Sequence, residues 1–143
     1  MQVPIHRLDP SVPLPRYETA GAAGFDLAAR ADQTIAPGEV TLVPTGLVIA
    51  VPAGHFLGIF ARSSTPLKRG LMVANGVGIV DADYCGPEDE IKIEVLNFTL
   101  APVTIRRGDR LAQGVILPFT RVDWAEADAP IQPTRGGFGA TGN

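Results

Sequence analysis

The feature that most constrains the fold of this chain is its density of glycine and proline. Glycine contributes 16 and proline 13 of the 143 residues, about a fifth of the chain, against roughly 12% in an average protein. Both residues disfavour the interior of a helix, glycine through its conformational freedom and proline through its missing N–H and fixed φ. So many helix breakers exclude a bundle of long helices and favour short strands joined by tight turns.

The composition describes a single domain without a basic surface. With 45% hydrophobic residues, a chain of this length can bury roughly 68–70% of its unfolded surface around one core. The formal net charge of −3 excludes the positive footprint of nucleic-acid binding, so we expect no nucleic-acid partner. The single cysteine, Cys85, cannot form an internal disulfide, and residues 1–7 lack a signal-peptide core. We therefore expect a cytoplasmic protein.

An uncharged stretch over residues 40–60 is long enough to span a bilayer, but its sequence favours strands. Two prolines, three glycines and a histidine interrupt it, and a helix with so many breakers would be badly broken. We predict strands over 40–43, 47–51 and 56–60, and no membrane segment.

The rest of the chain also predicts strands. Over residues 90–95 apolar and charged residues alternate, which places Ile91, Ile93 and Val95 on one face and Lys92 and Glu94 on the other. Further strands are expected over 103–105 and 111–119, joined by a turn at 107–110. A short helical turn near residues 66–68 is the only helix expected.

The domain boundary is expected near residue 124. From residue 125 the chain is poor in apolar residues and ends in a glycine-rich segment. We predict an all-β domain over 1–124 and a mobile C-terminal arm over 125–143.

Four clusters carry side chains suited to binding an anion or a nucleotide. They are the carboxylate of Asp26 among apolar neighbours, the triplet Arg62-Ser63-Ser64, a glycine-bearing hairpin over 75–84, and the arm with Arg135 and its glycines. Each also has a purely structural interpretation: a turn carboxylate, a surface ion pair, a strand-end turn and a terminal segment. Together they indicate a nucleotide site.

In order and spacing, these clusters resemble the five motifs of the trimeric dUTPase family. The matching segments are AGFDL (23–27), RSS (62–64), residues 75–86 with the core VDADYCG, RGDRLAQ (107–113) and RGGFGATG (135–142). The resemblance implies a jelly-roll-like β barrel or sandwich that forms a homotrimer. It also implies hydrolysis of dUTP to dUMP and pyrophosphate, with Mg²⁺ held through the substrate phosphates rather than by the protein.

The resemblance also implies roles for individual residues. Asp81 would activate the attacking water and meet the sugar 3′-hydroxyl, because a carboxylate is ionised at pH 7 and accepts two hydrogen bonds. Tyr84 would pack against the deoxyribose, and Asp26 would support the site. The base would be bound by Asn75 and the backbone through Ile79, Val80 and Asp81; the phosphates by Arg62, Ser63, Ser64 and Gln113, with Lys92 nearby; and the closed arm would contribute Arg135, Phe138 and Gly139.

Several residues depart from the family pattern. Ala140 replaces a frequent serine, the arm has two fewer residues between Arg135 and Phe138, residues 87–89 look inserted, and Ala61 replaces proline or glycine. Glu94 lies three residues before Asn97, where dCTP deaminases of the same fold carry a catalytic glutamate. A dCTP deaminase or a bifunctional enzyme is therefore one alternative. Another is a non-catalytic nucleotide-binding regulator. The structural interpretation of Glu94 is an ion pair with Lys92 or an arginine.

Overall fold

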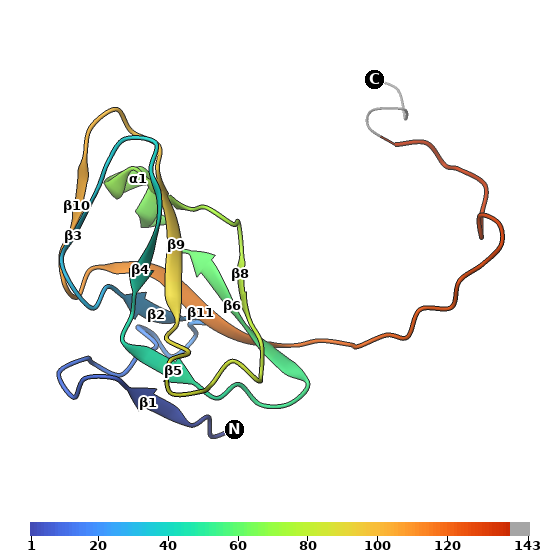
Figure 1. Ribbon diagram of the computed structural model, residues 1–143, viewed down its shortest axis with the longest axis horizontal. Helices are drawn as coiled ribbons and strands as arrows, with labels where there is room; N and C mark the ends of the chain where they lie inside the picture. The colour runs from blue at the N-terminus through green and yellow to red at the C-terminus, as the bar shows by residue number, and fades with distance from the viewer. Residues whose placement is uncertain (138–143) are drawn as a thin grey trace.

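Short antiparallel strands are the main regular elements of the computed structural model, which describes residues 1–137 (Figure 1). Within these residues the elements are β1 (Ile5–Arg7), β2 (Phe25–Ala28), β3 (Gln33–Ile35), β4 (Val40–Pro44), β5 (Leu47–Ile49), β6 (His55–Ala61), α1 (Ser64–Arg69), β7 (Leu71–Val73), β8 (Gly78–Val80), β9 (Lys92–Asn97), β10 (Val103–Ile105) and β11 (Arg110–Pro118). The expected all-β fold, a jelly-roll-like sandwich, is confirmed.

Two sheets hold the core between them. One has the strand order β2-β11-β6-β8 and the other β4-β9-β7, while β1 pairs with β5 and β10 with β3. The predicted alternation in β9 is confirmed, because Ile91, Ile93 and Val95 are buried while Lys92 is exposed on the opposite face. Both sheets contribute fully buried side chains to one cluster, among them Leu27, Leu57, Leu111, Val43, Ile93 and Val95.

The strand expected from residue 90 begins two residues later. Glu90 and Ile91 leave the sheet because the Ile91 N–H donates to the Leu47 carbonyl at 2.8 Å and the Ile91 carbonyl accepts from the Thr45 N–H at 3.1 Å. The expected helical turn near residue 66 is confirmed as α1. Its Thr65 hydroxyl donates to the Leu111 carbonyl at 2.8 Å, and Gly70 ends it with a left-handed φ of 65°.

The hairpin expected over residues 75–84 is not a pair of strands bonded to each other. A turn does form there, since Gly76 has φ 73° and the Val77 N–H donates to the Asn75 carbonyl at 2.9 Å. The flanking strands then part, because β7 pairs with β9 and β8 pairs with β6. This divergence opens space between β8 and β9.

The C-terminal segment leaves the sheets after β11. Residues 119–137 contain no strand and are exposed, and Figure 1 shows them running away from the β domain. Phe138, Gly139 and Ala140 lie outside the described residues. Within residues 1–137, no helix is long and apolar enough to cross a membrane.

Candidate functional site

A cavity of about 310 Å³ lies between β8 and β9, a size at the lower end of the range for small-molecule sites. We call it the β8–β9 cavity. Six residues predicted from the sequence line it, namely Asn75, Ile79, Val80, Asp81, Tyr84 and Lys92, together with Leu42, Ile59, Gly78, Glu90, Ile91 and Glu94. The structure therefore brings together most of the predicted nucleoside-binding residues.

The local sequence explains how β8 presents its backbone to this cavity. Val80 is buried against the core and Ile79 is 66% exposed, as strand alternation requires. Within the described part of the chain β8 is the end strand of its sheet and pairs only with β6. Its second edge therefore carries backbone N–H and C=O groups without a strand partner. The β8 edge can donate to and accept from a flat polar ligand.

Asp81 and Tyr84 lie on one tight turn at the end of β8. The Tyr84 N–H donates to the Asp81 carbonyl at 3.2 Å. Both side chains are exposed, and the Asp81 carboxylate has no hydrogen bond or ion pair to any residue in the described range. This carboxylate is available to a ligand or a water molecule.

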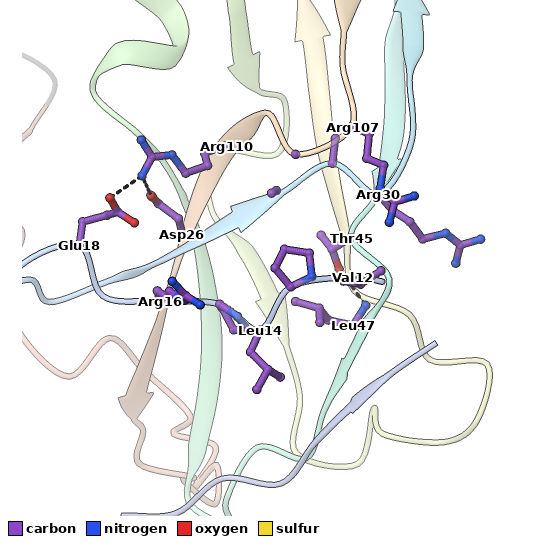
Figure 2. Close-up of a pocket in the computed structure, with 15 residues that line it drawn as sticks. Val12, Leu14, Arg16, Glu18, Asp26, Arg30, Thr45, Leu47, Arg107 and Arg110 are labelled. Atoms are coloured by element: carbon purple, nitrogen blue, oxygen red, sulfur yellow. Dashed lines mark hydrogen bonds and ion pairs between the residues drawn. The ribbon is translucent and has the colours of Figure 1, made fainter. Parts of the chain in front are cut away.

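A second cluster forms around Asp26, at the start of β2. The Arg62 Nε lies 2.7 Å from Asp26 Oδ1, and the Arg110 Nη1 lies 2.9 Å from Asp26 Oδ2. Figure 2 shows Arg110 between Asp26 and Glu18. Arg110 Nη1 lies 2.6 Å from Glu18 Oε2. The hydrogen bond with Glu18 is the main cause that raises the pKa of Arg110. Asp26 is thus a support for two arginines, and the surface ion pair considered for Arg62 is present.

Other residues that the sequence predicts to bind phosphate lie beside this cluster. Arg62 Nη1 donates to the Arg110 carbonyl at 3.1 Å, and Gln113 Nε2 donates to the Ala61 carbonyl at 3.1 Å. Ser63 and Ser64 follow at the start of α1. Motifs distant in sequence therefore meet where β6 and β11 pair.

A second cavity, of about 340 Å³, lies next to Asp26 (Figure 2). Of the predicted site residues, only Asp26 lines it. Its other lining residues include Pro13, Pro15, Arg16, Arg30 and Arg107. Size alone does not identify this cavity as the nucleoside site, because the predicted base-binding side chains line the β8–β9 cavity.

The structure separates the two clusters within one chain. Val80 is opposite Leu57 in the antiparallel pairing of β8 with β6, so Asp81 lies toward the N-terminal end of β6. Arg62 follows the other end, five residues past Leu57, which corresponds to about 17 Å at roughly 3.4 Å per residue. Asp81 and Arg62 of the same chain therefore do not converge on one phosphate.

Glu94 does not form the expected ion pair with Lys92 or an arginine. It is half-buried on β9, opposite Leu42 on β4, and lines the β8–β9 cavity. The ion pairs within residues 1–137 join other side chains, and none of them includes Glu94. Glu94 is therefore an unpaired carboxylate in the cavity wall.

The sequence analysis did not identify two acidic residues of the site. Glu18 binds Arg110, and Glu90 binds Arg30 at 3.2 Å. No motif marked either residue, since both contacts join segments far apart in the chain. Arg135 lies exposed in the C-terminal segment.

The described residues contain no group of three or more His, Cys, Asp or Glu side chains that could hold a metal ion. The protein side chains therefore do not fit a resident metal site within residues 1–137.

A family model for dUTPase matches residues 11–142 of this chain. The chain belongs to the dUTPase family. It is 46% identical to the deoxyuridine 5′-triphosphate nucleotidohydrolase of Thermobifida fusca (strain YX), over 99% of this chain and 79% of that protein. It is 44% identical to the enzyme of the same name from Anaeromyxobacter sp. (strain Fw109-5), over 93% and 90%.

Solved structures of dUTPases have the same fold. The crystal structure of dUTPase from Streptococcus mutans matches with a TM-score of 0.78 and 36% identity, over 87% of this chain and 100% of that chain. The dUTPase of Staphylococcus bacteriophage 80alpha with dUPNHPP matches with a TM-score of 0.87 over 99% of both chains. At 20% identity, the second likeness concerns the fold alone.

Proposed function

We propose that this chain hydrolyses dUTP to dUMP and pyrophosphate by in-line attack of water on the α-phosphorus. One observation carries the proposal: the β8–β9 cavity combines Asn75, an open backbone edge, Asp81 and Tyr84 in a chain of the dUTPase family. Removal of dUTP keeps uracil out of DNA and supplies dUMP for thymidylate synthesis. The single cysteine suits a reducing compartment, so we place this activity in the cytoplasm.

Uracil fits the polar groups at the cavity wall. Its edge presents two carbonyl acceptors around one N–H donor. The Asn75 amide supplies a donor and an acceptor, and the β8 edge at Ile79 and Val80 supplies backbone groups of both kinds. We expect these groups to bind the base and leave the sugar toward Asp81 and Tyr84.

The turn that joins Asp81 and Tyr84 sets the chemistry. The ionised Asp81 carboxylate would accept hydrogen bonds from the attacking water and from the sugar 3′-hydroxyl, and would take the proton as the water attacks. Tyr84 would pack against the deoxyribose, where the 2′-hydroxyl of a ribose would clash with the ring.

The phosphates would be bound by a second copy of the chain. Arg62, Ser63, Ser64 and Gln113 carry donors suited to phosphate oxygens, but the separation along β6 keeps them from the Asp81 of their own chain. A site built from neighbouring copies removes this conflict. We therefore propose a homotrimer in which each site combines residues from different chains.

An exposed apolar row supports self-association. Val40, Leu96 and Met72 are neighbours across β4, β9 and β7, on the face away from the core. Val40 is 54% and Met72 44% exposed, and such rows are typical of faces that a partner covers. Light scattering should give about three times the chain mass of 15.0 kDa. A fully active monomer would contradict the assembly.

The arm and the metal ion complete the proposal. We expect Arg135 to bind the γ-phosphate and Phe138 and Gly139 to close over the base. Because the described side chains form no metal cluster, the proposed Mg²⁺ would enter bound to the triphosphate. Its contribution would be to neutralise phosphate charge.

The deciding experiment incubates the protein with dUTP and, separately, with dCTP in the presence of Mg²⁺ and identifies the products. We expect dUMP and pyrophosphate from dUTP, and no ammonia from dCTP. Glu94→Gln should leave dUTP cleavage largely intact. No observation favours the deaminase or the non-catalytic alternative, and release of ammonia that disappears in Glu94→Gln would overturn this assignment.

A further inference from the structure

The Tyr84 ring is anchored at its far end by a single hydrogen bond. Its hydroxyl donates to the backbone carbonyl of Glu90 at 3.3 Å. Tyr84 is 40% exposed, so packing alone does not hold the ring, and the torsion χ2 that turns the ring has only a broad preference. The position of the Glu90 carbonyl therefore sets the orientation of the ring in the β8–β9 cavity.

The Glu90 side chain is itself held in place. Its carboxylate oxygen Oε1 accepts from the Gly46 N–H at 2.7 Å and from Arg30 Nη1 at 3.2 Å, and the side chain is only 12% exposed. The Glu90 N–H donates to the Glu88 carbonyl at 2.9 Å. The residue is thus fixed from both its backbone and its side chain.

The contact between Gly46 and Arg30 explains how Arg30 reaches Glu90. Gly46 has φ 74°, a conformation that favours glycine. A Cβ atom at this position would lie 2.9 Å from Cδ of Arg30 and 2.7 Å from Cγ2 of Val12. The stem of Arg30 therefore packs across the bare backbone of Gly46, and its guanidinium extends to Glu90. Arg30 also lines the cavity next to Asp26 (Figure 2).

We propose that Glu90 is a positioning residue that sets the sugar specificity of the site through Tyr84. Arg30 and the Gly46 N–H hold the Glu90 carboxylate, the anchored residue holds its carbonyl, and the carbonyl holds the Tyr84 hydroxyl. A ring fixed in this way leaves no room for a 2′-hydroxyl, whereas a ring free to tilt accommodates one. This inference rests on the proposed function in one respect, that Tyr84 packs against the sugar.

The test compares deoxyribose with ribose nucleotides in four variants and the wild type. Tyr84→Phe removes the hydroxyl and keeps the ring. Glu90→Ala removes the anchor, and Glu90→Gln keeps an acceptor for Gly46 but loses the charge that binds Arg30. Glu88→Ala is the matched control, because it removes an exposed carboxylate from the same loop that makes no side-chain hydrogen bond to the described residues.

Two readouts are measured for each protein: the ratio of kcat/KM for dUTP over UTP, and the ratio of affinities for dUMP over UMP by calorimetry. Tyr84→Phe and Glu90→Ala should lower both ratios about two- to tenfold, the effect of one lost hydrogen bond. Both ratios for Glu90→Gln should lie between those of the other two site variants and those of the wild type. Both ratios for Glu88→Ala should equal those of the wild type. Thermal melting of each variant reports any general loss of structure.

The outcomes separate this inference from the proposed function. Unchanged ratios in Tyr84→Phe and Glu90→Ala, in a wild type that cleaves dUTP and prefers dUMP, would overturn the positioning role alone, even if Glu90→Ala melts earlier. A wild type that neither cleaves dUTP nor prefers dUMP to UMP would overturn the proposed function and this inference with it.

Discussion

Replacing Asp26 with asparagine should destabilise the domain by an amount that the structure allows us to estimate. Asp26 is 13% exposed and binds Arg62, which is 24% exposed, and Arg110, which is 44% exposed. The contact with Arg62 is a short charge-assisted hydrogen bond, a type that contributes about 1.5–3 kcal/mol. The more exposed pair with Arg110 contributes less, because solvent screens it.

The asparagine retains one carbonyl oxygen that can accept from one of the two arginines. Part of the interaction therefore survives, and we expect the free energy of unfolding to fall by about 1–2 kcal/mol. For a domain of this size, each kcal/mol of stability corresponds to roughly 3–5 °C in melting temperature. Urea unfolding monitored by circular dichroism, at one protein concentration, measures the difference directly.

The matched control is Asp32→Asn. Asp32 also binds an arginine, Arg106, at 2.9 Å, but both side chains are more than half exposed, at 56% and 71%. Its other oxygen accepts from the Arg107 N–H at 2.8 Å, a hydrogen bond that an asparagine carbonyl retains. Solvent screens such a pair, so this variant should unfold at nearly the same urea concentration as the wild type. An Asp26→Asn variant as stable as the wild type, or an equal loss in Asp32→Asn, would refute the assignment of Asp26 as the support of the two arginines.

Three further predictions follow from the site and its surroundings. Asp81→Asn should keep nucleotide binding and reduce kcat by roughly 10²–10⁴-fold, because an amide cannot take the proton; near wild-type turnover would exclude the role. Ending the chain at Thr134 should reduce kcat by orders of magnitude yet leave the melting temperature nearly unchanged, since residues 119–137 are exposed; wild-type kcat would exclude a lid. Hydrogen bonds from Arg69 lower the pKa of Asp109 below its ordinary 3.8, so Asp109 stabilises the fold above that pH and ceases to do so as pH falls through the lowered value. The stability difference between wild type and Asp109→Asn should therefore shrink below about pH 4 in urea titrations.

Much of the fold was predictable from local patterns. The breakers between residues 40 and 60 and the alternation along β9 predicted strands that the structure contains, because burial on one face imposes a period of two on a strand. The strands β1, β2, β3 and β7 were not predicted. Each has three or four residues, too few to show a period, and each exists only because a distant strand supplies its hydrogen bonds.

For the candidate site, too, residues close together in the chain were predictable from the sequence, and contacts between distant residues were not. The side chains proposed to bind the nucleoside and the attacking water, Asn75, Asp81 and Tyr84, lie within one stretch of ten residues and are recognisable as a motif. Glu94 lines the β8–β9 cavity, but the ion pair expected for it is absent from residues 1–137. Whether a charged side chain is paired depends on which neighbours the fold brings to it.

The sequence by itself therefore determined the class of fold, the family and the motif proposed to carry the reaction, because these depend on residue type and spacing along the chain. Only the tertiary structure decided that β7 and β8 part to open the cavity, that Asp26 binds Arg62 and Arg110, and that Glu90 anchors Tyr84. These contacts join residues up to 84 positions apart. The physical reason is that a hydrogen bond acts over about 3 Å in space, while the order of residues constrains directly only neighbours along the chain.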